Sequence, residues 1–175
     1  MKYVYEFTNK RKVTKREFIH WFQKKFLYTI RKFKMISQND IIGFENKGDF
    51  RGVVLENLLE MFTERAMVDI VKLPSKKITK IAVPFTTDTE ADKIVNIIVK
   101  NNISKLKDSG PISGKLIKPL YLFLDKEVLL YAKLMNLKFK KTKEDKDKLS
   151  RFIDDLENKH PEIKHSIIKS YLELF

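Results

Sequence analysis

IIGFENKGDF, residues 41–50, decides the fold of this chain. Its first four residues form an apolar strand candidate that runs into a short polar turn. A helical pattern follows from Val53 to Phe62. Nucleotide enzymes use such a strand–turn–helix unit to hold phosphates against backbone N–H groups at the helix N-terminus. The stretch therefore has the frame of a phosphate-binding turn.

The residues inside this turn are not those that a phosphate requires. A phosphate-binding turn needs glycines, because a Cβ keeps the backbone away from the phosphate oxygens. Side chains occupy most positions, and an anion would also meet the charges of two carboxylates; the turn reads Glu45, Asn46, Lys47, Gly48, Asp49 and Phe50. We expect these side chains to leave no room for a triphosphate, so that the turn holds no nucleotide.

Strand and helix patterns alternate along the rest of the chain. We predict a buried parallel strand at 80–83 and either a strand or a helix end at 67–73. Thr87 or Asp88 is the expected cap of a helix at 89–101, with Ile98 among its inward residues, and Asp125 the cap of the next. The predicted helices are 14–34, 51–63, 89–101, 126–135, 149–158 and 161–174, with a loop at 105–115 and a charged link at 138–148.

This alternation predicts an α/β core with few parallel strands. At 175 residues the chain is long enough for one core with a small appendage. We divide it into an N-terminal basic segment with a long helix (1–36), an α/β core (37–124) and a C-terminal helical segment (125–175).

Composition indicates the class of partner. Lys and Arg number 36 against 23 Asp and Glu, a formal net charge of +13. This balance favours a polyanion, with nucleic acid first and an acidic membrane surface second, although a lysine-rich proteome would also raise the charge. No apolar run approaches the roughly 20 residues of a membrane span, and no signal peptide is visible. We expect a soluble cytoplasmic protein.

The residues that bind metals and clusters are few. The chain has no cysteine, which argues against disulfides, thiolate nucleophiles, iron–sulfur clusters and cysteine zinc sites. His20, His160 and His165 are too few and too scattered for a metal site, and surface or capping positions are expected for them. We therefore expect neither a bound metal nor a cofactor.

The helix predicted at 14–34 concentrates the positive charge. Thr14 and Glu17 have the spacing of a capping box. Apolar residues recur at three- and four-residue steps and are expected to pack inward: Phe18, Phe22, Phe26, Ile30 and Phe33. Between Lys10 and Lys34 the sequence has many Lys and Arg residues and one acidic residue, Glu17. A phosphate backbone is the natural partner of such an excess of positive charge. Adsorption to a membrane would first require the aromatic face to leave the core. The candidate nucleic-acid contacts are Lys10, Arg11, Lys12, Lys15, Arg16, Lys24, Lys25, Arg31 and Lys32.

Three stretches resemble one known family. KLIKPLYLFLDKEVLLYA (115–132) closely resembles the PP-loop ATPases that thiolate tRNA, the TtcA/TtuA and wobble-uridine thiolase group. The tail RFIDDLENKHPEIKHSIIKSYLELF (151–175) looks like the closing segment of that family, and residues 18–40 are similar to the helix that leads into its ATP loop. The resemblance implies a trimmed PP-loop core of Rossmann type, similar to the adenine nucleotide alpha hydrolases.

The chain departs from the family at its catalytic motifs. The family ATP loop reads S-G-G-K-D-S, and of it only Asp49 remains in residues 45–50. A second motif, T-G-H-N-x-D-D-E-A, aligns with residues 83–91, where Asp88 and Glu90 match and Phe85 replaces the histidine. The family's zinc-binding and sulfur-handling cysteines have no counterpart. The resemblance therefore implies a member without catalytic residues.

Three hypotheses follow. The leading one is a non-catalytic subunit of a tRNA wobble-uridine 2-thiolation complex, which binds tRNA and pairs, as a heterodimer or heterotetramer, with a catalytic PP-loop thiolase paralogue. The alternative is a stand-alone RNA-binding or regulatory module from the same family. In a third, Asp49, Asp88 and Glu90 hold Mg²⁺ for a residual ATPase, although helix capping and first-turn positions account for such carboxylates more simply.

Overall fold

The protein is an α/β structure built around one mixed sheet, in a computed structural model that describes residues 2–64, 66–141 and 147–175. Within these residues the sheet has five strands in the order β4-β3-β5-β7-β6. The predicted fold class is therefore confirmed. The strands are β3 (Ile41–Phe44), β4 (Asp69–Lys72), β5 (Lys80–Ala82), β6 (Ile112–Ser113) and β7 (Leu116–Ile117).

The strands of the sheet centre run parallel. β3 pairs with β4 and with β5, and β5 pairs with β7, all in parallel register. Among the described strands of this sheet, β6 is the antiparallel one; it forms a hairpin with β7 across Gly114, whose φ is +58°. The carboxyl ends of β3 and β5 therefore meet at one edge of the sheet. Residues 67–73, for which the sequence allowed either a strand or a helix end, contain the strand β4.

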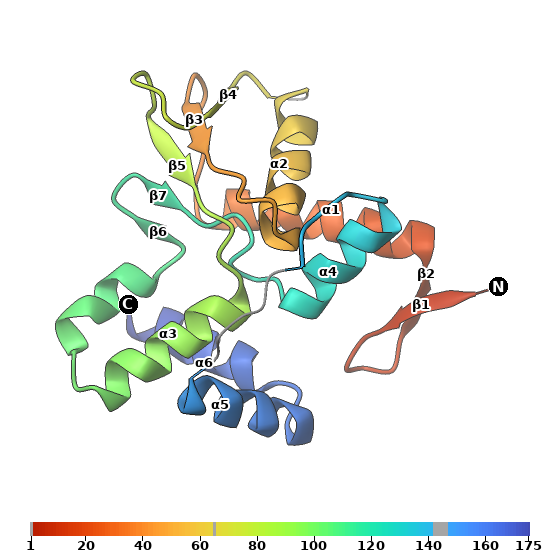
Figure 1. Ribbon diagram of the computed structural model, residues 1–175, viewed down its shortest axis with the longest axis vertical. Helices are drawn as coiled ribbons and strands as arrows, with labels where there is room; N and C mark the ends of the chain where they lie inside the picture. Colours follow the sequence, from red (N-terminus) through yellow and green to blue (C-terminus); the bar gives the residue numbers. More distant parts are fainter. Residues whose placement is uncertain (1, 65, 142–146) are drawn as a thin grey trace.

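Two groups of helices pack around the sheet. Figure 1 shows α1, α2 and α4 to the right of the strands and α3, α5 and α6 below them. A large core joins the first group to the sheet, and a smaller one fills the space between α3, η1 and α6 around Tyr121. The helices are α1 (Lys15–Lys32), α2 (Phe50–Thr63), α3 (Thr87–Val99), η1 (a 3₁₀ helix, Ile103–Ser109), α4 (Asp125–Leu134), α5 (Lys148–Lys159) and α6 (Ile163–Leu174).

Helix α1 has the predicted capping box and apolar face. The Thr14 hydroxyl accepts from the Glu17 N–H, and the Glu17 carboxylate accepts from the Thr14 N–H at 2.8 Å. Phe22 is completely buried, with its ring stacked on Tyr131 of α4 at 4.3 Å and 4.4 Å from the ring of Phe123. The division into segments 1–36, 37–124 and 125–175 stays a prediction, and all three contribute residues to the large core.

The sequence analysis missed the N-terminal hairpin of β1 (Tyr3–Glu6) and β2 (Lys12–Thr14). Tyr5 and Phe7 from the hairpin lie against Trp21 of α1, with the Phe7 and Trp21 ring centroids 4.8 Å apart. The alternation of aromatic residues at positions 3, 5 and 7 was the available signal, since period two is typical of a strand with one buried face.

Helix α3 begins and ends earlier than predicted. Its N-cap is Thr86, rather than Thr87 or Asp88, because the side chains of Thr86 and Thr89 each accept from the backbone N–H of the other. Ile98, expected to face inward, is half exposed near the end of the helix.

The predicted loop at 105–115 is instead ordered structure. It contains most of η1 and the β6–β7 turn. Lys93 and Lys118 both donate to the backbone carbonyl of Asp108, at 3.0 and 3.1 Å, and so fasten η1 to α3 and to the sheet. Sequence cannot show such contacts, because they join residues that are distant along the chain.

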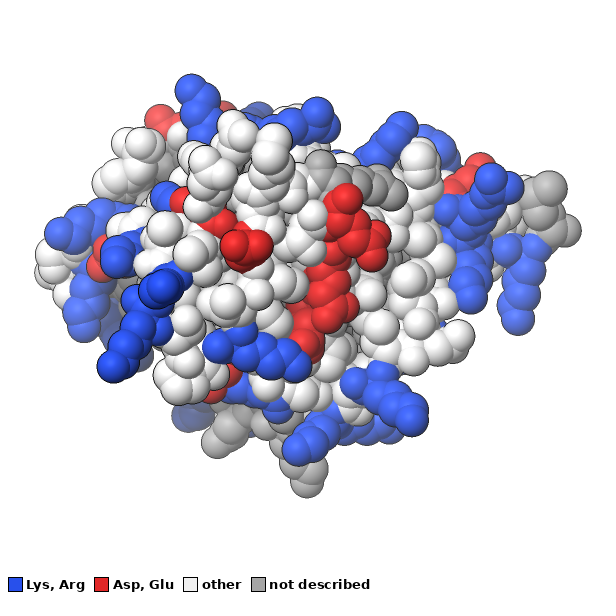
Figure 2. Space-filling view, turned by 90° about the horizontal axis from the view of Figure 1, so that it is seen from above, with Lys and Arg blue, Asp and Glu red and all other residues white. Residues whose placement is uncertain are grey.

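Charged side chains are unevenly spread over the surface. Figure 2 shows one face with Asp and Glu side chains near its middle and Lys and Arg mainly around its edges. Among the described residues, no helix combines the length and the apolar character that crossing a bilayer requires.

Phe22→Ala is expected to lower the free energy of unfolding by about 3–5 kcal/mol, because it leaves a cavity between α1 and α4. Urea unfolding followed by circular dichroism measures this loss. Phe152→Ala is the matched control, since its ring is 57% exposed and its removal should cost less than about 0.5 kcal/mol. Equal effects of the two substitutions would contradict the central position given to Phe22.

Candidate functional site at the carboxyl edge of the sheet

The strand–turn–helix frame is present where the sequence predicts it. β3 ends at Phe44, and α2 begins at Phe50 with Asp49 as its N-cap. The Asp49 carboxylate accepts from the Gly52 N–H at 3.0 Å, and the Asn46 side-chain oxygen accepts from the Gly48 N–H at 2.8 Å. Side chains of the turn itself therefore occupy N–H groups of the kind that a bound phosphate would use.

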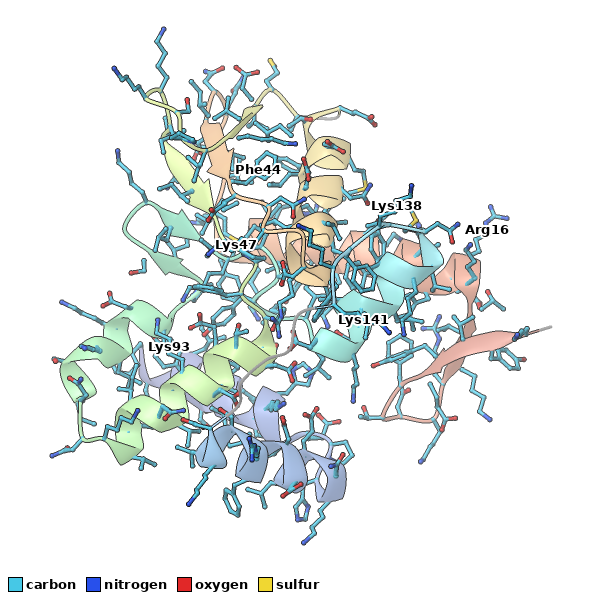
Figure 3. The ribbon with its side chains drawn as sticks, viewed as in Figure 1. Arg16, Phe44, Lys47, Lys93, Lys138 and Lys141 are labelled. Atoms are coloured by element: carbon cyan, nitrogen blue, oxygen red, sulfur yellow. The ribbon has the colours of Figure 1, made fainter. Side chains whose placement is uncertain are left out.

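A later segment of the chain lies against this turn. The Lys140 N–H donates to the Gly48 carbonyl at 2.7 Å, and the rings of Phe139 and Phe50 meet edge to face at 6.3 Å. Figure 3 shows Lys138 and Lys141 on this segment and Lys47 on the turn. The sequence analysis took residues 138–148 for a link, and 142–146 of that range lie outside the described residues. No local pattern marks the contact, because Gly48 and Lys140 are 92 positions apart in the sequence.

A pocket of about 300 Å³ remains beside the turn. Glu45 and Lys47 pair at 3.7 Å and extend into solvent, with 63% and 78% of their side chains exposed. These two side chains therefore leave space beside the turn, while the Gly48 and Gly52 N–H groups already donate to side chains of the turn. That a triphosphate finds no room there stays a prediction. Apolar residues after β4 and around the end of β5 form much of the wall: Leu73, Ile81, Ala82, Val83, Pro84 and Phe85.

The N-termini of three helices meet next to this pocket. Asp125, the first residue of α4, accepts from the hydroxyl of Thr86, the N-cap of α3, at 2.7 Å. The Asp125 N–H donates in turn to the Asp88 carboxylate at 2.7 Å. Arg51 in the first turn of α2 forms a two-point ion pair with Asp125 and lies 3.9 Å from Asp49. Asp125 was the predicted cap of α4; it is instead the first helical residue, because its carboxylate binds the other two helices.

These N-termini carry the positive end of the helix dipole and attract negative charge. Here the negative charge comes from the protein, as the carboxylates of Asp49, Asp88 and Asp125. Burial and the neighbouring Asp125 carboxylate raise the pKa of Asp88. The site therefore already holds the anions that this arrangement of helices favours.

Lys164 of α6 supplies the matching cation. Its buried ammonium donates to Asp88 at 2.5 Å and Asp154 at 2.7 Å, and lies 2.9 Å from Glu157. Burial alone would lower the pKa of Lys164, but the hydrogen bonds to these carboxylates raise it above its usual value. The same three carboxylates have the spacing of metal ligands. An ammonium already lies among them, so the cluster is an internal ion pair.

The three carboxylates that would hold Mg²⁺ in the third hypothesis each bind a different partner within the protein. Asp49 caps α2 and Asp88 binds Lys164, whereas Glu90 is buried against Lys118 at 3.0 Å. Burial raises the pKa of Glu90 and lowers that of Lys118. The sequence analysis did not foresee the lysines that bind Glu90 and Asp88.

The structure separates the predicted RNA contacts into two environments. Lys25 is largely buried, with its ammonium 3.0 Å from Glu127 and above the rings of Trp21 and Phe123. Its charge is therefore balanced inside the chain. The other candidates are exposed on the hairpin and on α1: Lys10, Arg11, Lys12, Lys15, Arg16, Lys24, Arg31 and Lys32.

The histidines do not lie together. His20 and His160 are exposed, as expected, whereas His165 is half-buried, and this burial lowers its pKa. The single metal-type group found among the described residues contains no histidine.

The sequence matches no known protein-family profile and no curated protein sequence. A solved structure is similar: the U34-tRNA thiolase NcsA from Methanococcus maripaludis with its [4Fe-4S] cluster. The TM-score is 0.80 at 17% identity, and the match covers 98% of this chain and 84% of that one. The similarity shows that the two chains share a fold, which agrees with the PP-loop core expected from the sequence.

Lys164→Met is expected to lower the free energy of unfolding by about 3–5 kcal/mol at pH 7, because it leaves three partly buried carboxylates without their buried cation. The loss should shrink toward pH 5. Without the ammonium, the carboxyl pKa values rise above those of the unfolded chain, and acidification then favours the folded variant relative to wild type. Urea unfolding at pH 7 and pH 5 measures both effects.

Lys169→Met on the same helix is the control. Its side chain is 80% exposed and pairs only at the surface with Glu173, so a change under about 1 kcal/mol is expected. A loss for Lys164→Met that is equal at both pH values would contradict the proposed ion-pair cluster.

Proposed function

We propose that this protein is a non-catalytic subunit of a tRNA wobble-uridine 2-thiolation complex. In this proposal it binds tRNA and pairs with a catalytic PP-loop thiolase paralogue. The fold shared with a U34-tRNA thiolase over 98% of this chain supports a place in tRNA thiolation.

The observation that carries the non-catalytic part is the hydrogen bonding of the turn after β3. Activation of a uridine by ATP requires that the phosphates be held and their charge stabilised. In this chain Asn46 accepts from the Gly48 N–H of the turn, and Asp49 accepts from the Gly52 N–H in the first turn of α2. Asp88 accepts from the first N–H of α4. A triphosphate would have to displace these carboxylates and the Asn46 amide. The partner subunit would therefore supply the chemistry.

Binding of tRNA is supported by the exposed cations of the hairpin and α1. Further exposed cations are Lys47 on the turn and Lys138 and Lys141 on the segment after α4 (Figure 3). RNA phosphates bind such surfaces through charge, with release of counterions. The apolar faces of α1 remain in the core, so tRNA binding needs no rearrangement of the helix.

The first test is RNA affinity as a function of salt. Binding of unmodified tRNA should weaken as salt rises, and each contacted phosphate adds about 0.7 to 0.9 to the slope of log affinity against log salt. Replacing Lys15, Arg16 and Lys24 together by Gln should reduce this slope by about 2. Fluorescence anisotropy measures it.

The matched control replaces Lys105, Lys159 and Lys169 by Gln, which removes the same charge from exposed positions elsewhere. An equal loss of slope in the control would show that net charge, and not the surface of α1, determines binding.

The second test concerns catalysis and partnership. Isothermal titration with Mg-ATP should give no binding heat for this chain alone. Co-expression with a catalytic PP-loop thiolase paralogue from the same cell should give a stable complex, and 2-thiouridine should form only in its presence. ATP binding, or 2-thiouridine made by the isolated chain, would overturn the proposal. RNA binding without association with the paralogue would instead favour a stand-alone RNA-binding module.

A further inference from the structure

A shallow hollow of about 490 Å³ lies between the N-terminal hairpin and the exposed side of α1. We call it the α1 hollow; its lining includes Arg11, Glu17, His20, Trp21, Lys24 and Tyr28. His20, Lys24 and Tyr28 follow each other at steps of four residues and so lie on one face of the helix. Arg11 reaches the same hollow from the start of β2.

Tyr28 is an unusual residue at this surface. The residue is 51% exposed, and among the described residues no other aromatic ring packs against its ring. Trp21, in contrast, is held by Tyr5, Phe7 and Phe18. Tyr28 is therefore the ring of the α1 hollow on which a flat ligand has room to stack.

One cation lies over this ring, and a second lies one helical turn away. The Lys32 ammonium lies 5.6 Å from the Tyr28 ring centroid, and Lys24 is one helical turn away. Among the described residues, neither Lys24 nor Lys32 forms an ion pair. The acid of the hollow, Glu17, accepts from the N–H and hydroxyl of Thr14. It is also 11 positions from Tyr28, about 16 Å along the helix at 1.5 Å per residue.

An exposed ring among cations matches the chemistry of an unpaired nucleotide. The base stacks on the ring, and the phosphates on either side meet the lysines. A base within a duplex cannot stack in this way, because both of its faces are covered by neighbouring base pairs. The hollow thus fits single-stranded RNA better than a helix of RNA.

We propose that the α1 hollow binds one unpaired nucleobase of an RNA strand, stacked on Tyr28, with the flanking phosphates against Lys24 and Lys32. This inference rests on the proposed function in one respect, since both require that the chain bind RNA. It adds a specific residue and a preference for unpaired segments, such as loops.

The experiment compares a fluorescent single-stranded RNA of twelve nucleotides with the same sequence in a blunt duplex, using the full chain and anisotropy. Tyr28→Ala should weaken binding of the single strand by about 5- to 150-fold, the effect of losing one stacked base. Tyr28→Phe keeps the ring and should stay within about twofold of wild type. Duplex affinity and the salt slope should be unchanged for Tyr28→Ala, because no charge is removed.

Tyr3→Ala is the matched control, since Tyr3 is also an exposed tyrosine, on β1, and it does not line the hollow. Salt-dependent RNA binding that is insensitive to Tyr28→Ala would overturn this inference and leave the proposed function intact. The absence of any RNA binding would overturn both. Binding to vesicles with 30% anionic lipid that depends on Tyr28, without RNA binding, would assign the hollow to a membrane surface instead.

Discussion

The structure depends on one electrostatic constraint: α2, α3 and α4 all begin at the carboxyl edge of the sheet. Their N-termini each favour negative charge, and nucleotide-binding proteins satisfy similar helix ends with phosphate. Here Asp49, Asp88 and Asp125 satisfy them, and the cations Arg51 and Lys164 balance those carboxylates. The charges are therefore neutralised within the protein. A pocket remains next to them, and the nearby N–H groups of Gly48 and Gly52 donate to side chains of the turn.

The same ion pairs tie the C-terminal helices to the core. Lys164 lies on α6, and two of its partners, Asp154 and Glu157, lie on α5. The position of these helices is thus coupled to the edge where α3 and α4 begin. On the other side of the molecule, α1 is fixed by aromatic packing and by the Lys25–Glu127 ion pair. This leaves the outer side of α1, with its cations and Tyr28, available to a partner while the core stays unchanged.

Sequence reasoning succeeded where the signal was local. The strand β3, the helices and the capping box of α1 follow from apolar periodicity and from residues three or four positions apart. It failed where distant residues decide the outcome. The contact of Lys140 with Gly48, the anchoring of η1 by Lys93 and Lys118, and the burial of Lys25 all join segments that are separated along the chain. The role of Asp125 was misjudged for the same reason, since its carboxylate serves α2 and α3.

The sequence by itself determined the α/β class, the excess of positive charge and the scarcity of glycine in the turn after β3, because composition and short-range pattern suffice for these properties. Only the tertiary structure decided which charges are balanced inside the protein and which remain exposed at its surface. The physical reason is that ion pairing and burial depend on distances between side chains, and folding sets those distances between residues as far apart in sequence as Asp88 and Lys164. Tyr28 likewise has one property that the sequence determines and one that the tertiary structure determines. Its position on α1 follows from the sequence, whereas its exposure beside the hairpin follows from packing.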